Sequence, residues 1–63
     1  MVDLNNVQHH IMAQLAQGKT NKEAAQTLHM NIYTLRNHLV EIFAILGATN
    51  RTSAVIKFLN TPG

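Results

Sequence analysis

Two adjacent polar residues, Arg36 and Asn37, have side chains that can read bases in DNA. In the major groove, an arginine guanidinium pairs with the edge of guanine and an asparagine amide pairs with the edge of adenine. Both fall on one side of the segment from Asn31 to Leu46 when it is projected as a helix. On that side, Tyr33 adds an aromatic ring with a hydroxyl, and Val40 or Ala44 could touch the methyl group of a thymine.

A second polar group, Thr20-Asn21-Lys22, suits contact with phosphate. Thr20 and Glu23 have the spacing of a capping box, in which hydroxyl and carboxylate each bond the other residue's backbone N–H. Free backbone N–H groups and the positive end of the helix dipole favour an anion at such a helix start. Both polar groups also occur for purely structural reasons, so their spacing alone leaves DNA binding open.

The sequence contains no pattern that indicates a metal site, a cofactor site or an enzyme active site. The chain has no cysteine and no paired acidic ligands, and its histidines are spread over different predicted helices as His9, His10, His29 and His38. We expect these to be surface or cap residues. The acidic residues are scattered, and neither a nucleophile–base set nor a glycine-rich phosphate loop is present. We therefore predict no metal, no cofactor and no enzymatic activity.

The length of 63 residues, with 46% hydrophobic composition, predicts one small domain spanning residues 1–63. Five Lys and Arg against three Asp and Glu give a net charge of +2, which permits a nucleic-acid partner without requiring one. No apolar run approaches the ~20 residues that cross a bilayer, and no signal peptide opens the chain. We expect a cytoplasmic protein without membrane contact. The initial methionine and short tail favour a complete small protein.

Apolar residues recur at three- and four-residue spacing, which predicts an all-α, four-helix fold. The expected helices span about residues 5–17, 21–28, 32–46 and 51–59. We expect the N-caps of the first three to be Asn5 or Asn6, Thr20 and Asn31. Glycines at positions 18 and 47 suit the left-handed position that ends the first and third helices.

The predicted core is formed by one side of each helix. Its members from the first and third helices are Val7, Ile11, Leu15, Leu35, Leu39, Ile42 and Leu46. The fourth helix is apolar on two sides, and a short helix of that kind requires a second partner. We therefore predict a homodimer interface on the side away from the core, made of Thr52, Val55, Ile56 and Leu59.

The three residues between the second and third helices give the spacing of a helix-turn-helix motif, whose second helix enters the major groove. From Leu15 to Val55 the chain also resembles the LuxR/FixJ-type (GerE-like) helix-turn-helix DNA-binding domain. The resemblance is carried by LAQGKTNKEAA at 15–25, TLRNHL at 34–39, Ile42-Phe43, Leu46-Gly47 and NRTSAV at 50–55.

The resemblance implies four helices, of which the third reads DNA and the fourth mediates dimerisation. The DNA contacts that it implies are Thr20, Asn21, Lys22, Thr34, Arg36 and Asn37, with Tyr33 and His38 beside them. It also places Arg51, after Asn50, at the start of the fourth helix, where we expect it to hold the turn and to reach a phosphate.

The chain departs from this family pattern late in the third helix and just beyond it. Basic residues are usual there, and this chain has Ala44, Ile45 and Thr49 in their places. Acidic residues usual in the first helix are replaced by Gln8 and His10. Fewer phosphate contacts predict modest affinity per monomer. We expect a sequence-specific transcriptional regulator that binds double-stranded DNA as a homodimer on a roughly palindromic site. The alternative is an interaction module that forms a heterodimer with a related regulator.

Overall fold

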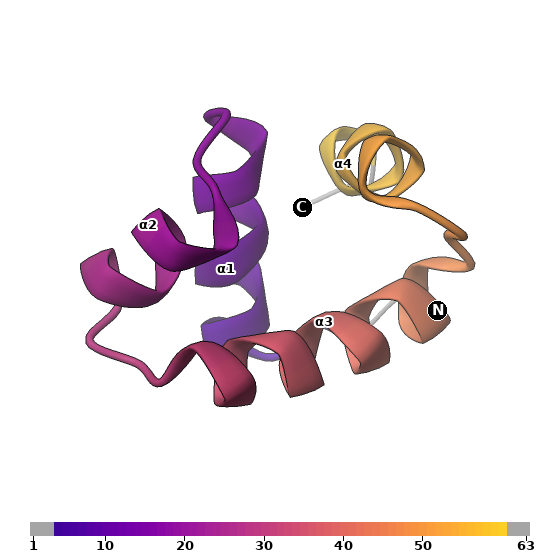
Figure 1. Cartoon of the computed structure of the whole chain (residues 1–63). Coiled ribbons are helices and arrows are strands. Elements are labelled where there is room, and N and C mark those ends of the chain that lie inside the picture. Colours follow the sequence, from indigo (N-terminus) through magenta and orange to yellow (C-terminus); the bar gives the residue numbers. More distant parts are fainter. Residues whose placement is uncertain (1–3, 61–63) are drawn as a thin grey trace.

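The computed structural model describes residues 4–60, which form four helices and no strand. The helices are α1 (Asn6–Ala16), α2 (Asn21–Thr27), α3 (Ile32–Leu46) and α4 (Arg51–Leu59). The all-α prediction is confirmed. In Figure 1, α3 runs along the lower edge, α1 and α2 stand above its first half, and α4 lies above its far end. The outer side of α3 is thus left without a covering helix.

The helix starts are set by polar caps. The Asn5 side chain accepts from the Gln8 N–H, and Gln8 Oε1 in turn accepts from the Asn5 N–H, so α1 begins one residue later than predicted. Asn31 and Asn50 cap α3 and α4 in the same manner, by accepting from the backbone N–H groups of residues 33 and 53. These bonds satisfy N–H groups that have no partner within the helix.

Three helices end in a left-handed residue that reverses the chain. Gly18 and Gly47 have φ values of 87° and 67°, and His29 takes the same role after α2 with φ 54°. Behind His29, the Met30 N–H donates to the Ala25 carbonyl at 2.9 Å, which closes the two-bond Schellman arrangement. Helices α1 and α2 therefore end at Ala16 and Thr27, one residue earlier than predicted, and α2 turns directly into α3.

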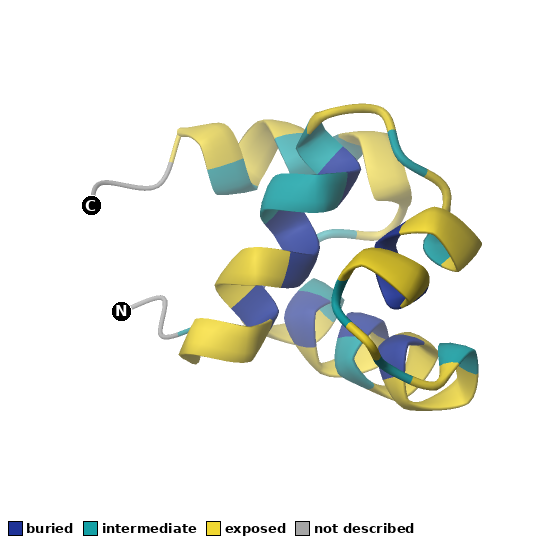
Figure 2. Cartoon of the chain, turned by 90° about the vertical axis from the view of Figure 1, so that its left-hand side faces the viewer, coloured by how far each residue is buried: buried dark blue, intermediate teal, exposed yellow. Residues whose placement is uncertain are grey.

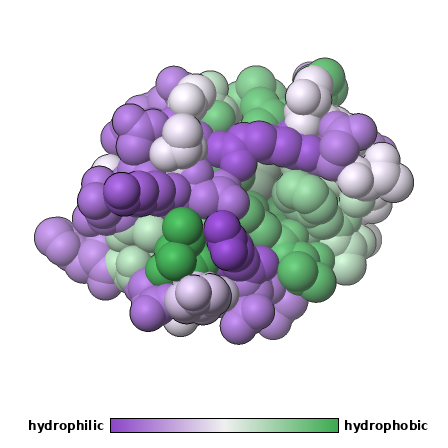
Figure 3. Space-filling view, viewed as in Figure 1, coloured by the Kyte–Doolittle hydropathy of each residue, from purple (hydrophilic) through white to green (hydrophobic). Residues whose placement is uncertain are grey.

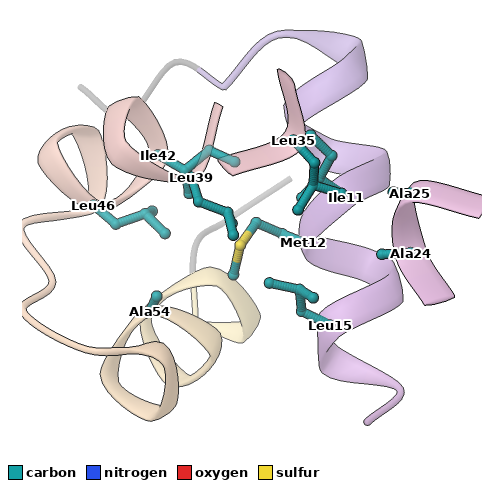
Figure 4. Close-up of a cluster of buried hydrophobic side chains, with 10 residues drawn as sticks. All are labelled: Ile11, Met12, Leu15, Ala24, Ala25, Leu35, Leu39, Ile42, Leu46 and Ala54. Atoms are coloured by element: carbon teal, nitrogen blue, oxygen red, sulfur yellow. The ribbon is translucent and has the colours of Figure 1, made fainter. Parts of the chain in front are cut away.

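The core lies where α1, α3 and α4 meet, with α2 closing it at one side (Figures 1 and 4). Figure 4 shows the Met12 side chain at the centre, directed from α1 toward α3 and α4. The alanines of α2 and α4 let these helices approach closely. The buried apolar residues are Ile11, Met12, Leu15, Ala24, Ala25, Leu35, Leu39, Ile42, Leu46 and Ala54.

One core prediction is wrong. Val7 is 42% exposed, and its neighbour Gln8 is buried instead, with 2% exposure. Gln8 closes the α1 capping box and donates from Nε2 to the Glu41 carboxylate of α3 at 3.1 Å. These bonds satisfy the amide of Gln8, so a polar side chain can occupy the place predicted for valine.

The start of α2 yields a pH-dependent prediction. The bonds that Thr20 makes through its backbone N–H and its side chain hold the pKa of Glu23 below its ordinary value of 4.5. A lowered pKa contributes stability above that ordinary value, and the contribution is lost as pH falls through the lowered pKa. Thr20→Ala should lower the free energy of unfolding by about 0.5–2 kcal/mol near pH 7, the cost of losing a cap.

Urea denaturation at pH 7 and pH 3 checks this prediction. The deficit of Thr20→Ala should shrink as the pH falls through the lowered pKa of Glu23, because protonation of the carboxylate weakens its half of the capping box. Thr27→Ala removes the same atoms from the exposed last turn of α2 and serves as the control. An equal deficit for Thr20→Ala at both pH values would contradict the assigned role of Glu23.

Candidate DNA-binding surface

The outward side of α3 is open to solvent. Tyr33 and Val40 are 69% and 72% exposed, and Arg36, Asn37 and Ala44 are exposed with them. The opposite side of the same helix is buried against α1 and α4, so the core holds this surface in place (Figure 2). The exposure of Arg36 and Asn37 leaves their donor and acceptor groups available to a ligand.

The N-terminus of α3 is fixed close to this surface. The Tyr33 N–H donates to Asn31 Oδ1 at 2.7 Å, and Thr34 is exposed in the same first turn. The Schellman turn at His29 joins α2 directly to α3, and the two helices pack against each other as a helix-turn-helix unit.

The start of α2 brings Thr20, Asn21 and Lys22 together. Lys22 and Thr20 are exposed, whereas Asn21 is half-buried. Thr20 Oγ1 accepts from the Glu23 N–H at 3.1 Å, and the Thr20 N–H donates to Glu23 Oε1 at 2.9 Å. The capping box thus places a carboxylate at this helix start, so attraction of a phosphate would depend on the ammonium group of Lys22.

Arg51 ties the start of α4 to the start of α2. Its Nη1 donates to Asn21 Oδ1 at 2.7 Å, and its Nη2 donates to the backbone carbonyl of Lys19. These bonds fix the start of α4 to the loop that precedes α2, while the contact of Arg51 with phosphate stays a prediction. The guanidinium is exposed, so it adds positive charge beside Lys22 while fixing α4.

Arg51→Lys should lower the free energy of unfolding by about 1 kcal/mol, because a lysine cannot make both bonds with the geometry of the guanidinium fork. Urea denaturation measures the loss. Arg36→Lys makes the same chemical change on the exposed side of α3 and should alter stability by less than about 0.5 kcal/mol. Equal stability of the two variants would show that the Arg51 bonds contribute nothing to the fold.

His38 is the predicted contact that differs most from the others. It is half-buried, and its Nδ1 is buried without a hydrogen-bond partner, whereas its neighbours Arg36 and Asn37 are exposed. Of the nine predicted contact residues, seven lie at the start of α2 and on α3 besides His38; six of these are exposed, and Asn21 is half-buried. His38 is half-buried on the flank of α3, and Arg51 and Asn21 bond to each other.

Sequence reasoning missed the link between Gln8 and Glu41. The bond joins the first turn of α1 to the middle of α3 and directs the Glu41 carboxylate toward α1. The signal was present as Asn5-x-x-Gln8, which has the spacing of a capping box and predicts that the Gln8 side chain folds back toward the helix start.

The outer side of α4 is a second exposed surface. Ile56 and Leu59 are 53% and 65% exposed, and Thr52 is exposed beside them. Val55 is half-buried and packs against the core of its own chain. Figure 3 shows hydrophilic residues over the side of α2, and apolar residues gathered in the middle and toward α4.

Within residues 4–60, no group of three or more His, Cys, Asp or Glu side chains could hold a metal ion. No pocket is found in this part of the chain. None of its helices is by itself long and apolar enough to cross a membrane, and only α3 and α4 taken together, bent by 61° at their break, pass that test.

Comparison with known proteins identifies the family to which the chain belongs. The model of the bacterial regulatory proteins of the luxR family matches residues 4–58. The transcriptional regulatory protein LiaR of Bacillus subtilis is 37% identical over 46 residues, which are 73% of this chain and 22% of that protein.

Two further relatives are similar over more of the chain. The transcriptional regulatory protein LnrK of Bacillus subtilis is 34% identical over 89% of this chain and 26% of its own length. The transcriptional repressor ThaA of Burkholderia thailandensis is 35% identical over 81% of this chain and 21% of its own length. The chain thus spans about a quarter of the length of the curated relatives that it matches.

Proposed function

Since this chain belongs to the luxR family of bacterial regulatory proteins, as one of their helix-turn-helix DNA-binding domains, we propose that it binds a roughly palindromic DNA site as a homodimer. A domain of this family is a regulator and not an enzyme, and we expect it to act in the bacterial cytoplasm, where the DNA is. The observation that carries the proposal is the exposure of Arg36 and Asn37 on the side of α3 that no other helix covers.

The two groups of contacts have different roles in this proposal. Lys22, with Thr20 and Asn21 beside it, contacts phosphates and positions the duplex. Arg36 and Asn37 select bases, and an arginine bonded bidentately to guanine together with an asparagine bonded to adenine gives the strongest discrimination. Tyr33 and Thr34 lie at the end of α3 that is closest to α2, where they contact the edge of the site.

Dimerisation is supported by α4. A helix that leaves Ile56 and Leu59 exposed gains by packing against the same surface of a second copy, and such a contact has two-fold symmetry. Two α3 helices related in this way enter successive major grooves about 34–36 Å apart. The net charge of only +2 favours this arrangement, because two weak contacts add to one useful affinity.

Selection of bound duplexes from a random pool at moderate salt tests the proposal. We expect enrichment of a sequence with two-fold symmetry whose half-sites are separated by about one helical turn. Retention of duplexes without any shared sequence would contradict sequence-specific binding, and enrichment of a single asymmetric half-site would contradict the homodimer.

Ile56→Glu should produce a monomer, because the carboxylate would be buried at the two-fold interface. Sedimentation at increasing concentration measures the association. Binding to the symmetric duplex should fall at least tenfold, while binding to an isolated half-site stays unchanged. Val7→Glu places the same charge on an exposed residue of α1 as the control. Wild-type affinity of Ile56→Glu for the symmetric duplex would exclude α4 as the interface.

A second candidate function follows from the same surface of α4. Ile56 and Leu59 would also fit the matching helix of a longer relative, giving a heterodimer that changes the activity of that relative. Native mass spectrometry of the chain mixed with a relative separates the two functions. A mixed species without retention of any specific duplex by the chain alone favours the interaction module, and the absence of mixed species excludes it.

A further inference from the structure

The side chain of Val40 is open to solvent on the uncovered side of α3. It is 72% exposed, more than any other large apolar side chain in residues 4–60, although it lies in the middle of the longest helix. A β-branched residue slightly disfavours a helix, and an exposed one contributes no packing in return. The methyl groups of Val40 are therefore available to a ligand that approaches this side of α3.

The neighbours of Val40 identify the ligand. Arg36 and Asn37 lie four and three residues earlier, so they share one side of α3 with Val40. The one acidic side chain next to it, Glu41, is directed away, because its carboxylate accepts from Gln8 of α1. Val40 thus stands on the surface assigned to base contacts, without a carboxylate that would repel the duplex.

We propose that Val40 reads the methyl group of a thymine, a proposal that rests on the proposed function. A valine side chain has no donor or acceptor, and the thymine methyl is the apolar group that base pairs present in the major groove. The side chain has one strongly preferred rotamer in a helix, so its two methyl groups form a rigid contact.

The position of the thymine follows from helix geometry. Four residues separate Val40 from Arg36, which corresponds to about 6 Å along the helix axis. Successive base pairs are about 3.4 Å apart. The thymine should therefore lie within about two base pairs of the guanine that Arg36 contacts.

Replacement of single thymines by uracil in the selected duplex tests this inference. Uracil keeps the hydrogen-bonding groups of thymine and lacks its methyl group. The wild-type chain should bind about fourfold more weakly when one particular thymine is replaced, since a contact of one methyl-sized group is lost. Val40→Ala should bind the thymine and uracil forms of that duplex equally. Val7→Ala, the same kind of change on α1, should keep the wild-type preference.

The outcomes separate the two proposals. If the chain retains a specific duplex but no thymine replacement weakens it, or if Val40→Ala keeps the preference for thymine, the inference about Val40 is overturned and DNA binding stands. If no duplex is retained, the proposed function and this inference are both overturned. Helical circular dichroism of Val40→Ala confirms that the variant is folded.

Discussion

Replacement of Arg36 by alanine should weaken binding to the preferred duplex by roughly 1–3 kcal/mol and relax discrimination at one base pair. The guanidinium is exposed on the uncovered side of α3 and can form two parallel bonds to guanine. Loss of both bonds removes the interaction that distinguishes the correct base, so affinity for random duplexes should change far less. Titration of labelled specific and random duplexes measures the two affinities.

Lys22→Ala is the matched control for Arg36→Ala. Both variants remove one positive charge from an exposed position, yet the lysine is assigned to phosphate. Lys22→Ala should weaken specific and random duplexes by similar factors and reduce the slope of log affinity against log salt by about 1. If Arg36→Ala, like Lys22→Ala, weakened specific and random duplexes by the same factor, the assignment of bases to α3 and phosphates to α2 would be wrong.

Ile42→Ala should lower the free energy of unfolding by about 2–5 kcal/mol, because it leaves a cavity at a fully buried position. Ile42 lies on the core side of α3, behind the surface that carries Arg36. A domain of this length has a total stability of roughly 3–9 kcal/mol. The variant should therefore lose a large share of its stability, and urea denaturation together with far-ultraviolet circular dichroism measures the loss.

The control for Ile42→Ala lies two residues away on the same helix. Val40→Ala shortens a residue that is 72% exposed, and it should change stability by less than about 0.5 kcal/mol. The pair separates the two sides of α3, since Ile42→Ala should lose stability and Val40→Ala should lose contact with DNA. Comparable destabilisation by both changes would mean that α3 does not have one buried and one open side.

The features that the sequence predicted well are those that depend on neighbouring residues. The capping box at Thr20 and the caps at Asn5 and Asn31 are confirmed, because each requires residues at most three positions apart. The buried side of α3 is confirmed for the same reason, since a helix repeats its apolar residues at fixed spacing. Helix-turn-helix spacing and these local signals fixed the place of Arg36 on the open side.

The features that sequence reasoning missed depend on tertiary packing. The burial of Gln8 in place of Val7 could not be predicted without knowing that Glu41 of α3 lies opposite the first turn of α1. The bonds of Arg51 to Asn21 and Lys19 join residues about thirty positions apart, which no local pattern specifies.

The central claim is that the side of α3 bearing Arg36 enters the duplex. Cross-saturation from the selected duplex to the deuterated chain tests it most directly, because the signal of each backbone amide falls according to its distance from DNA protons. We predict the strongest attenuation between Tyr33 and Val40, with a weaker effect at the start of α2. Attenuation confined to α4, or spread evenly over the chain with α3 no stronger than the rest, would contradict the claim.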